Sequence, residues 1–209
     1  MILASSSKQR IKLMDLLFKD FKNLSVEVDE SFSNDFDLYE GIREVAYKKA
    51  IAVKDFFDIE NDFIVATDTI VSFDNKILLK PKSYDEAFSM IKSYEGKEQE
   101  VISGFVFLKI ENGKIVFEKK ETVISKVKFQ DLSDEKVKKW LDLDLYKFCS
   151  GGFMIEKVEE DFLIEISGSY SNIIGLPLEI LKEKCDYFNI EINDIDVSNI
   201  EILKNKMKL

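Results

Sequence analysis

One carboxylate lies inside the most apolar stretch of the sequence. Residues 63–73 read FIVATDTIVSF, and in a continuous strand Asp68 would share one face with Ile64, Ala66 and Ile70. A carboxylate on such a face is unfavourable unless it pairs with a cation, binds a metal or lines a cleft. The alternative is a strand that stops at Ala66 and leaves Asp68 in a turn.

A second group of polar side chains follows a short apolar strand at residues 2–4. Residues 5–7 are three serines, and the cations Lys8, Arg10 and Lys12 come directly after them. Free N–H groups at a helix N-terminus, together with hydroxyls and cations, form an anion site. The alternative is that one serine is an ordinary helix N-cap. The segment is not a P-loop, because GxxxxGK[ST] does not occur in the chain.

Three further segments carry weaker signals. Asp29 and Glu30 follow an expected strand and could supply oxygen ligands, although a solvated turn is the alternative. Lys80 precedes Pro81 at another expected strand end, where a lysine commonly faces solvent. Residues 168–177 combine glycines, hydroxyls and an amide before a helix, and either connect two elements or order a site.

Composition excludes several classes of chemistry. The 209 residues include no histidine, which rules out a Ser-His-Asp triad and any histidine-ligated zinc site. Acid–base work would fall to carboxylates, lysines or tyrosines, and a metal would be a hard cation on oxygen ligands. The net charge of −10 argues against nucleic acid as the main partner, but not against a small anion held by local cations.

The chain also lacks the signs of a membrane or secreted protein. No stretch approaches the roughly 20 apolar residues of a membrane span. The N-terminus does not resemble a signal peptide, and Cys149 and Cys185 form no CxxC pattern. A cytoplasmic protein with reduced thiols is expected, without a membrane partner.

Hydrophobic periodicity predicts the elements that would position these residues. Strands are expected at 2–4, 21–28, 63–73, 77–79, 100–110, 115–129 and 161–166. Helices are expected at 8–18, 38–57, 84–94, from a Ser133 cap to about 143, at 178–188 and in a short segment after 198. This order predicts an α/β fold with a mixed twisted sheet and flanking helices. We expect one domain over 1–188 and a C-terminal extension over 189–209.

Three motifs occur in an order that resembles a known family. They are LASSS near the N-terminus, VATDTIVSFDNKILLKP in the middle and GSYSNIIGLPLEIL near the end. The set resembles the Maf family of nucleoside triphosphate pyrophosphatases, formerly described as septum formation inhibitors. The resemblance implies a cytoplasmic α/β enzyme related in fold to inosine triphosphate pyrophosphatases and usually homodimeric. It further implies hydrolysis between the α and β phosphates with Mg²⁺ or Mn²⁺.

The resemblance also assigns roles to residues of this chain. Asp68 falls on the catalytic aspartate and Glu30 on the metal-associated acid, so both are expected to hold the metal. Lys80 completes the expected catalytic group. The residues expected to bind substrate are Ser5, Ser7, Lys8, Gln9, Arg10, Lys49, Thr69 and Glu156.

The chain departs from the family pattern at several of these positions. The usual S-P-R-R loop reads Ser7-Lys8-Gln9-Arg10, and Lys8 is expected to compensate for the missing arginine. Residue 99 is glutamine where the family has histidine, and residue 149 is cysteine where it has lysine.

The departure with the clearest consequence is Glu156. Members that favour dTTP and UTP carry glutamine at this position, and those that favour 7-methyl-GTP carry glutamate. An ionised carboxylate only accepts hydrogen bonds, which favours a guanine-type base with adjacent N1–H and N2–H donors. The alternative is that Glu156 points to solvent and pairs with Lys157.

Two other functions are alternatives to this hydrolase. One is a nucleotide-binding regulator of septum formation or cell division with little turnover. The other, hydrolysis of inosine or xanthosine triphosphate, belongs to a sister family whose motifs do not occur here. The presence of Asp68 and Lys80 favours the enzyme.

Overall fold

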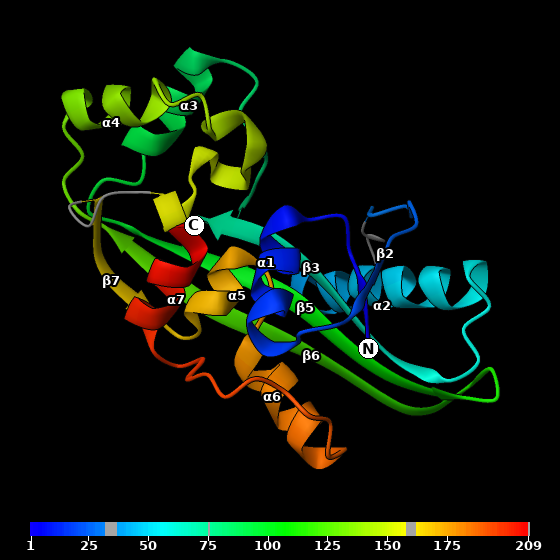
Figure 1. Ribbon diagram of the computed structural model, residues 1–209. Coiled ribbons are helices and arrows are strands. Elements are labelled where there is room, and N and C mark those ends of the chain that lie inside the picture. The colour runs from blue at the N-terminus through cyan, green and yellow to red at the C-terminus, as the bar shows by residue number, and fades with distance from the viewer. Residues whose placement is uncertain (32–36, 75, 158–161, 209) are drawn as a thin grey trace.

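A mixed β-sheet forms the centre of the molecule (Figure 1). The computed structural model describes residues 1–31, 37–74, 76–157 and 162–208. Within them the strand order is β2-β1-β3-β5-β6-β7, and β4 pairs with β3 beside this path. β1 is parallel to β2 and β3, and the other pairs are antiparallel. The strands are β1 (Ile2–Ala4), β2 (Lys22–Leu24), β3 (Asp62–Phe73), β4 (Lys76–Leu78), β5 (Glu98–Glu111), β6 (Lys114–Phe129) and β7 (Leu163–Ser167).

Helices cover both faces of this sheet (Figure 1). The helices are α1 (Lys8–Leu17), α2 (Leu38–Phe56), α3 (Tyr84–Lys92), α4 (Asp134–Leu141), α5 (Tyr170–Ile174), α6 (Leu178–Tyr187) and α7 (Ile200–Lys208). Three 3₁₀ turns, η1 (Tyr146–Phe148), η2 (Ser150–Gly152) and η3 (Ile155–Lys157), follow α4. The helix α2 packs on one face and α1, α5, α6 and α7 on the other. The α/β class with a mixed sheet is confirmed. Among the described helices, none combines the length and apolarity that crossing a bilayer requires.

The strand β3 is continuous through the catalytic candidate. It pairs with β5 from Asp62 to Ser72, and Asp68 lies opposite Gly104. The alternative that the strand stops at Ala66 is therefore wrong. The Asp68 side chain is on the face covered by α2, where Ile64 and Ala66 belong to the smaller core cluster.

A glycine in β5 lets α2 approach the sheet closely. A Cβ atom at Gly104 would lie 2.2 Å from the carbonyl oxygen of Ile42 and 2.8 Å from Cα of Arg43. Such contacts are impossible, so this crossing requires glycine. Lys49 follows Ile42 by two helical turns on the same side of α2, which directs it toward β3 at Asp68.

Two expected elements differ from those observed. The strand expected over 21–28 pairs only at Lys22–Leu24, because the short β1 offers three residues to pair with. The loop expected over 168–177 contains α5, whose N-cap Ser169 accepts from the backbone N–H of Asn172 at 3.0 Å. The strand expected over 161–166 is observed as β7, and residue 161 lies outside the described residues.

The C-terminal segment packs into the body of the protein. Val197, Leu203 and Met207 are buried members of the larger core cluster. The side-chain amide of Asn193 donates to the carbonyl of Leu16 at 3.0 Å. The backbone N–H of Asn193 donates to the carbonyl of Leu17 at 2.7 Å. The described part of the expected extension, residues 189–208, therefore contributes side chains to the core of the preceding domain.

Candidate functional site

A single lysine joins the two carboxylates expected at the site. The ammonium group of Lys49 on α2 donates to Asp68 on β3 and lies 2.7 Å from the carboxylate of Glu30. The side chains of Lys49 and Asp68 are each 14% exposed, whereas that of Glu30 is 60% exposed. Lys49 therefore compensates the charge of the largely buried Asp68, whereas most of the Glu30 side chain remains accessible to a ligand.

Arg10 is fixed from three sides. Its Nε donates to the carbonyl of Gly175 at 2.9 Å, Nη2 to Thr69 Oγ1 at 3.1 Å and Nη1 to Ser5 Oγ at 3.4 Å. Burial lowers the pKa of Arg10, while the charges of Asp68 and Glu30 raise it. Arginine remains a cation in proteins, so the site holds an oriented guanidinium.

The carbonyl of Gly175 is an anchor that sequence reasoning did not single out. Besides Arg10, it accepts from Thr67 Oγ1 at 2.8 Å. Thr69 in turn contacts Ser103 Oγ at 2.8 Å. Gly175 has φ +123°, and a Cβ there would lie 3.2 Å from Arg10 Nε. In the sequence, the only sign of this role is that Gly175 precedes Leu176-Pro177 in the third motif. The segment 168–177 therefore orders the site and does not merely connect two elements.

Arg10, Glu30 and Lys49 line a polar cavity of about 630 Å³ at the start of α1. Asp68 and Thr69, which contact Lys49 and Arg10, are not among the residues that line it. Its polar lining includes Ser5, Ser6, Ser7, Gln9, Arg10, Glu30, Lys49 and Lys80. Ser7 is also the N-cap of α1, and its hydroxyl accepts from the backbone N–H of Arg10 at 3.4 Å. The N-cap alternative thus holds for Ser7, which lines the cavity as well. Lys8 is exposed and is not among the residues that line this cavity.

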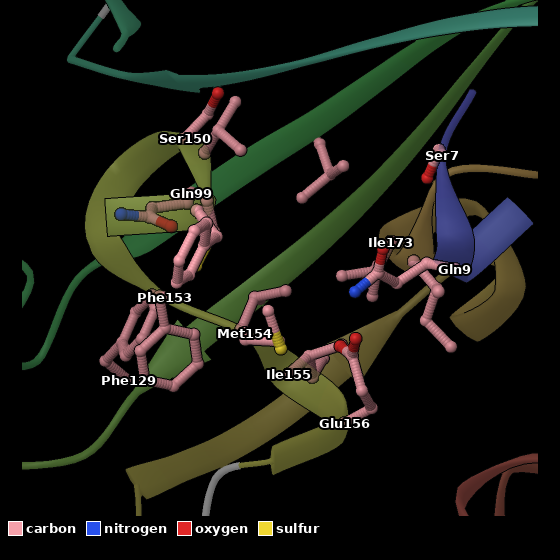
Figure 2. Close-up of a pocket in the computed structure, with 16 residues that line it drawn as sticks. Ser7, Gln9, Gln99, Phe129, Ser150, Phe153, Met154, Ile155, Glu156 and Ile173 are labelled. Carbon is pink, nitrogen blue, oxygen red and sulfur yellow. The ribbon is translucent and has the colours of Figure 1, made fainter. Parts of the chain in front are cut away.

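A second cavity of about 200 Å³ shares part of its wall with the first and is called the apolar cavity below, because most of the side chains that line it are apolar. Figure 2 shows its lining residues. The two cavities share Ser7, Gln9 and Phe148 in their walls. The remaining wall comes mainly from apolar side chains, which are Val71, Val101, Val127, Phe129, Phe153, Met154, Ile155, Ile173 and Ile174. A narrow apolar pocket that opens onto a cation-rich one can receive a ligand with one flat apolar end and one anionic end.

Glu156 is the buried acid of the apolar cavity. Only 5% of it is exposed, so the alternative that it points to solvent is wrong. Figure 2 shows its side chain and that of Gln9 extending toward one another. Desolvation raises the pKa of Glu156. A hydrogen bond from its own backbone N–H and the charges of Lys157 and Lys12 lower the pKa, but by less, so the net shift is upward. Burial therefore favours the neutral carboxylic acid, which has one donor and one acceptor.

Besides Lys157 and Lys12, a thiol and a phenol with raised pKa values interact with Glu156. Burial raises the pKa of Cys149 to about 12, and the charge of Glu156 acts in the same direction. Burial likewise raises the pKa of Tyr170 on α5, with smaller contributions from Glu156 and from Glu201 on α7. Gln9, in place of the family arginine, adds no positive charge that would ionise Glu156.

Gln99 is a further polar side chain in the wall of the apolar cavity. It is 4% exposed, and its Nε2 has no hydrogen-bond partner within the described residues. It occupies the position where the family pattern has histidine. The departure from the family pattern at residue 99 was recognisable in the sequence, but it indicated no role for Gln99.

Comparison with known proteins identifies the family to which the chain belongs. Residues 1–186 match the model of the family described as Maf-like protein. The chain belongs to the Maf-like protein family. Its curated Maf-like relatives include a protein named dTTP/UTP pyrophosphatase from Clostridium botulinum (strain Okra / Type B1). That protein is 35% identical over 184 residues, which are 86% of this chain and 92% of the relative.

Further similar proteins come from other organisms. A dTTP/UTP pyrophosphatase of Pyrococcus abyssi (strain GE5 / Orsay) is 40% identical over 182 residues, covering 87% of this chain and 92% of the relative. Among solved structures, the Ham1 protein of Staphylococcus aureus matches with a TM-score of 0.38 and 13% identity. That match covers 64% of this chain and 71% of the Ham1 chain.

The carboxylates of the Maf-like site have the chemistry expected of a magnesium site completed by substrate. Among the described residues, no group of three or more His, Cys, Asp or Glu side chains could enclose a metal. Glu30 and Asp68 nevertheless converge on one cationic group, the ammonium of Lys49. Mg²⁺ commonly uses one or two carboxylates together with substrate phosphates and water, so this pair fits the metal.

Proposed function

We propose that this Maf-like protein is a nucleoside triphosphate pyrophosphatase that cleaves the bond between the α and β phosphates. The observation that carries the proposal is the junction of the two cavities at Ser7, Gln9 and Phe148. The polar cavity would hold the phosphates and the apolar cavity the base. The relatives named dTTP/UTP pyrophosphatase support the same reaction. The biological role would be removal of non-canonical or surplus nucleotides.

The polar cavity has the cations that a triphosphate requires. Arg10, Lys49 and Lys80 line one space, and the hydroxyls of Ser5 and Ser7 add donors. Arg10 is already oriented by Gly175, so its guanidinium can bind phosphate oxygens with little loss of freedom. We infer that these residues bind the triphosphate and stabilise the charge that develops during hydrolysis.

Asp68 is the base in this proposal. Its carboxylate, held by Lys49, would orient a water molecule and accept its proton as the water oxygen attacks phosphorus. Attack at the α phosphorus leaves the proton on Asp68 and breaks the P–O bond to the β phosphate, so pyrophosphate is the leaving group and the monophosphate carries the new P–O bond. Thr69 and Ser5 act by positioning Arg10.

Glu30 and Asp68 would hold Mg²⁺ or Mn²⁺ together with substrate phosphates. When bound, the metal supplies Lewis-acid withdrawal of charge from phosphate oxygens. Glu30 is the more accessible of the two carboxylates, since its side chain is 60% exposed. Lys49 keeps both carboxylates directed toward the same space.

For the base, we propose thymine or uracil, in place of the guanine-type base expected from an ionised Glu156. A neutral carboxylic acid offers an O–H donor and a carbonyl acceptor, as the family glutamine does. This pair matches the O4 acceptor and N3–H donor of thymine and uracil. The names of the relatives agree with that choice. A mismatched buried polar pair would cost about 1–3 kcal/mol, enough for a preference of tenfold or more.

The test is pyrophosphate release from a nucleotide panel of dTTP, UTP, CTP, GTP, 7-methyl-GTP and ITP with Mg²⁺. We expect nucleoside monophosphate and pyrophosphate as products, with dTTP and UTP hydrolysed fastest. Release of inorganic phosphate from the γ position would contradict cleavage at the α–β bond. Tight nucleotide binding without turnover would instead favour the regulator of septum formation or cell division.

Two features implied by the family resemblance remain part of the proposal. A homodimer is expected, and sedimentation equilibrium measures its mass directly. A cytoplasmic location is expected, and cell fractionation tests it.

A further inference from the structure

The C-terminal segment lies outside the part of the chain that the family model covers. That model ends at residue 186, whereas α7 begins at Ile200. The curated relatives described above align over 182 and 184 residues of this chain. The described part of the segment is nevertheless firmly attached, because Asn193 bonds to the end of α1 and the carbonyl of Ile195 accepts from Lys182.

The helix α7 packs behind the apolar cavity. It contacts η3, α5 and α1, which are the elements that carry Glu156, Ile173 and Gln9 of the cavity wall. Figure 1 shows α7 beside α5 and close to the 3₁₀ turns that follow α4. Leu203 is fully buried and Met207 is 2% exposed, so these two side chains of α7 are fully used in this packing.

The turn that carries Glu156 has little support of its own. The 3₁₀ turn η3 is three residues long, and the backbone N–H of Lys157 donates to the carbonyl of Met154 at 3.1 Å. Among the described residues, no side chain donates a hydrogen bond to the carboxyl group of Glu156. Packing from α7 and α5 therefore helps to fix where this turn places Glu156.

We propose that α7 is a positioning element for substrate recognition: Leu203 holds η3 against α5, and thereby sets the width of the apolar cavity and the placement of Glu156. This inference rests on the proposed function, because it treats the apolar cavity as the base site. Residues of the extension do not touch the reacting atoms; they act through the cavity wall. A loosened α7 would weaken recognition of the base and leave the phosphate site intact.

The experiment compares two leucine-to-alanine variants in the full-length chain. Leu203→Ala removes packing behind the cavity, and Leu108→Ala is the matched control. Leu108 is also fully buried but belongs to the core cluster on the opposite face of the sheet, under α2. Both changes leave comparable voids, so a merely structural effect would be the same in the two variants. Leu203→Val, which leaves a smaller void, repeats the test if Leu203→Ala does not fold.

Two readouts separate base recognition from general damage. We expect Leu203→Ala to raise KM for dTTP by about threefold or more with kcat nearly unchanged. Inorganic pyrophosphate, used as a competitive inhibitor, probes the polar cavity alone, and its inhibition constant should stay unchanged. Leu108→Ala should change neither value at a temperature where it is folded.

Equal KM values in the two folded variants, or a parallel rise in the inhibition constant of pyrophosphate, would overturn the role of α7. Those outcomes would leave the proposed hydrolysis standing, because it is measured in the wild type. Absence of hydrolysis in the wild type would instead remove the proposed function itself. A fluorescent thymidine nucleotide binding to both variants with equal affinity would then remove the role of α7 as well.

Discussion

Lys49 and Asp68 form an ion pair across the contact between α2 and β3, and the same ammonium group lies 2.7 Å from Glu30. One lysine thus determines the spacing of two carboxylates that come from distant parts of the sequence. Both Lys49 and Asp68 are largely shielded, so their pairing holds the Asp68 carboxylate next to Lys49, which lines the polar cavity.

The first prediction concerns Asp68→Asn. The amide keeps the size of the side chain but cannot accept the proton of the attacking water, so kcat should fall by roughly 10²-fold or more. Steady-state pyrophosphate release measures the loss. The control is Asp62→Asn on the same strand, which breaks the ion pair of Asp62 with the Met1 amino group and should lower stability without lowering kcat. Near-normal turnover of Asp68→Asn would remove this residue from the mechanism.

The second prediction concerns the metal. Glu30 and Asp68 offer only oxygen atoms, so activity should require Mg²⁺ or Mn²⁺ and disappear in excess EDTA. Adding back Mg²⁺ should restore it. Glu30→Gln should raise the Mg²⁺ concentration needed for half-maximal rate. The control is Glu44→Gln on α2, because Glu44 pairs with Lys120 and does not line the polar cavity. Full activity after rigorous chelation would contradict a metal-dependent reaction.

The third prediction is a pH-dependent base preference. Burial raises the pKa of Glu156 above 4.5, so its neutral form persists to higher pH in the folded protein. As pH rises through the folded pKa, the donor is lost, and the ratio of kcat/KM for dTTP to that for GTP should fall. In Glu156→Gln this ratio should stay high and flat with pH. A flat ratio in the wild type would exclude this role for Glu156.

The same titration affects stability with a definite sign. The unfolded chain ionises Glu156 near pH 4.5, whereas burial raises the pKa of Glu156 in the folded chain, which therefore loses the proton at a higher pH. The free energy of unfolding of the wild type, relative to Glu156→Gln, should therefore fall as pH rises above 4.5 and level off above the folded pKa. Urea denaturation at several pH values measures this difference without any substrate.

The fourth prediction concerns the close contact of α2 with β5. Gly104→Ala would place a methyl group 2.2 Å from the Ile42 carbonyl oxygen, so α2 must move away from the sheet. We expect a loss of about 1–3 kcal/mol or more in stability, and a lower kcat because Lys49 moves from Asp68. Gly113→Asn is the control, since Gly113 has open space around it and a φ of +71° that asparagine tolerates. Unchanged stability of Gly104→Ala would contradict the close crossing.

The strands and helices with strong periodicity could be predicted from the sequence, and so could most of the polar cavity. Asp68 was recognisable because a charge inside an apolar strand requires a partner. Lys49 became a candidate through its family motif, but its partner depends on how α2 crosses β5. That crossing is a tertiary contact at Gly104, which local patterns do not record.

The apolar cavity shows what a linear reading misses. Glu156 was treated as ionised because an exposed carboxyl group is ionised at neutral pH and the sequence does not show that this one is buried. Its burial results from packing by α5 and α7, which follow it in the chain. Lys8 was expected to replace the missing arginine, yet it lies on the exposed side of α1, because Ser7 and Arg10 take the inward positions of the first turn.

The two joined cavities differ in how they would respond to dissolved salt. Lys80 and Glu30 are open to solvent in the polar cavity, so mobile ions screen its attraction for phosphates. The apolar cavity recognises its ligand through shape and through neutral hydrogen-bonding groups, which salt hardly affects. Raising KCl at constant Mg²⁺ should therefore increase KM for dTTP and GTP by the same factor. Affinity would vary with ionic strength in this enzyme, while discrimination between bases would stay constant.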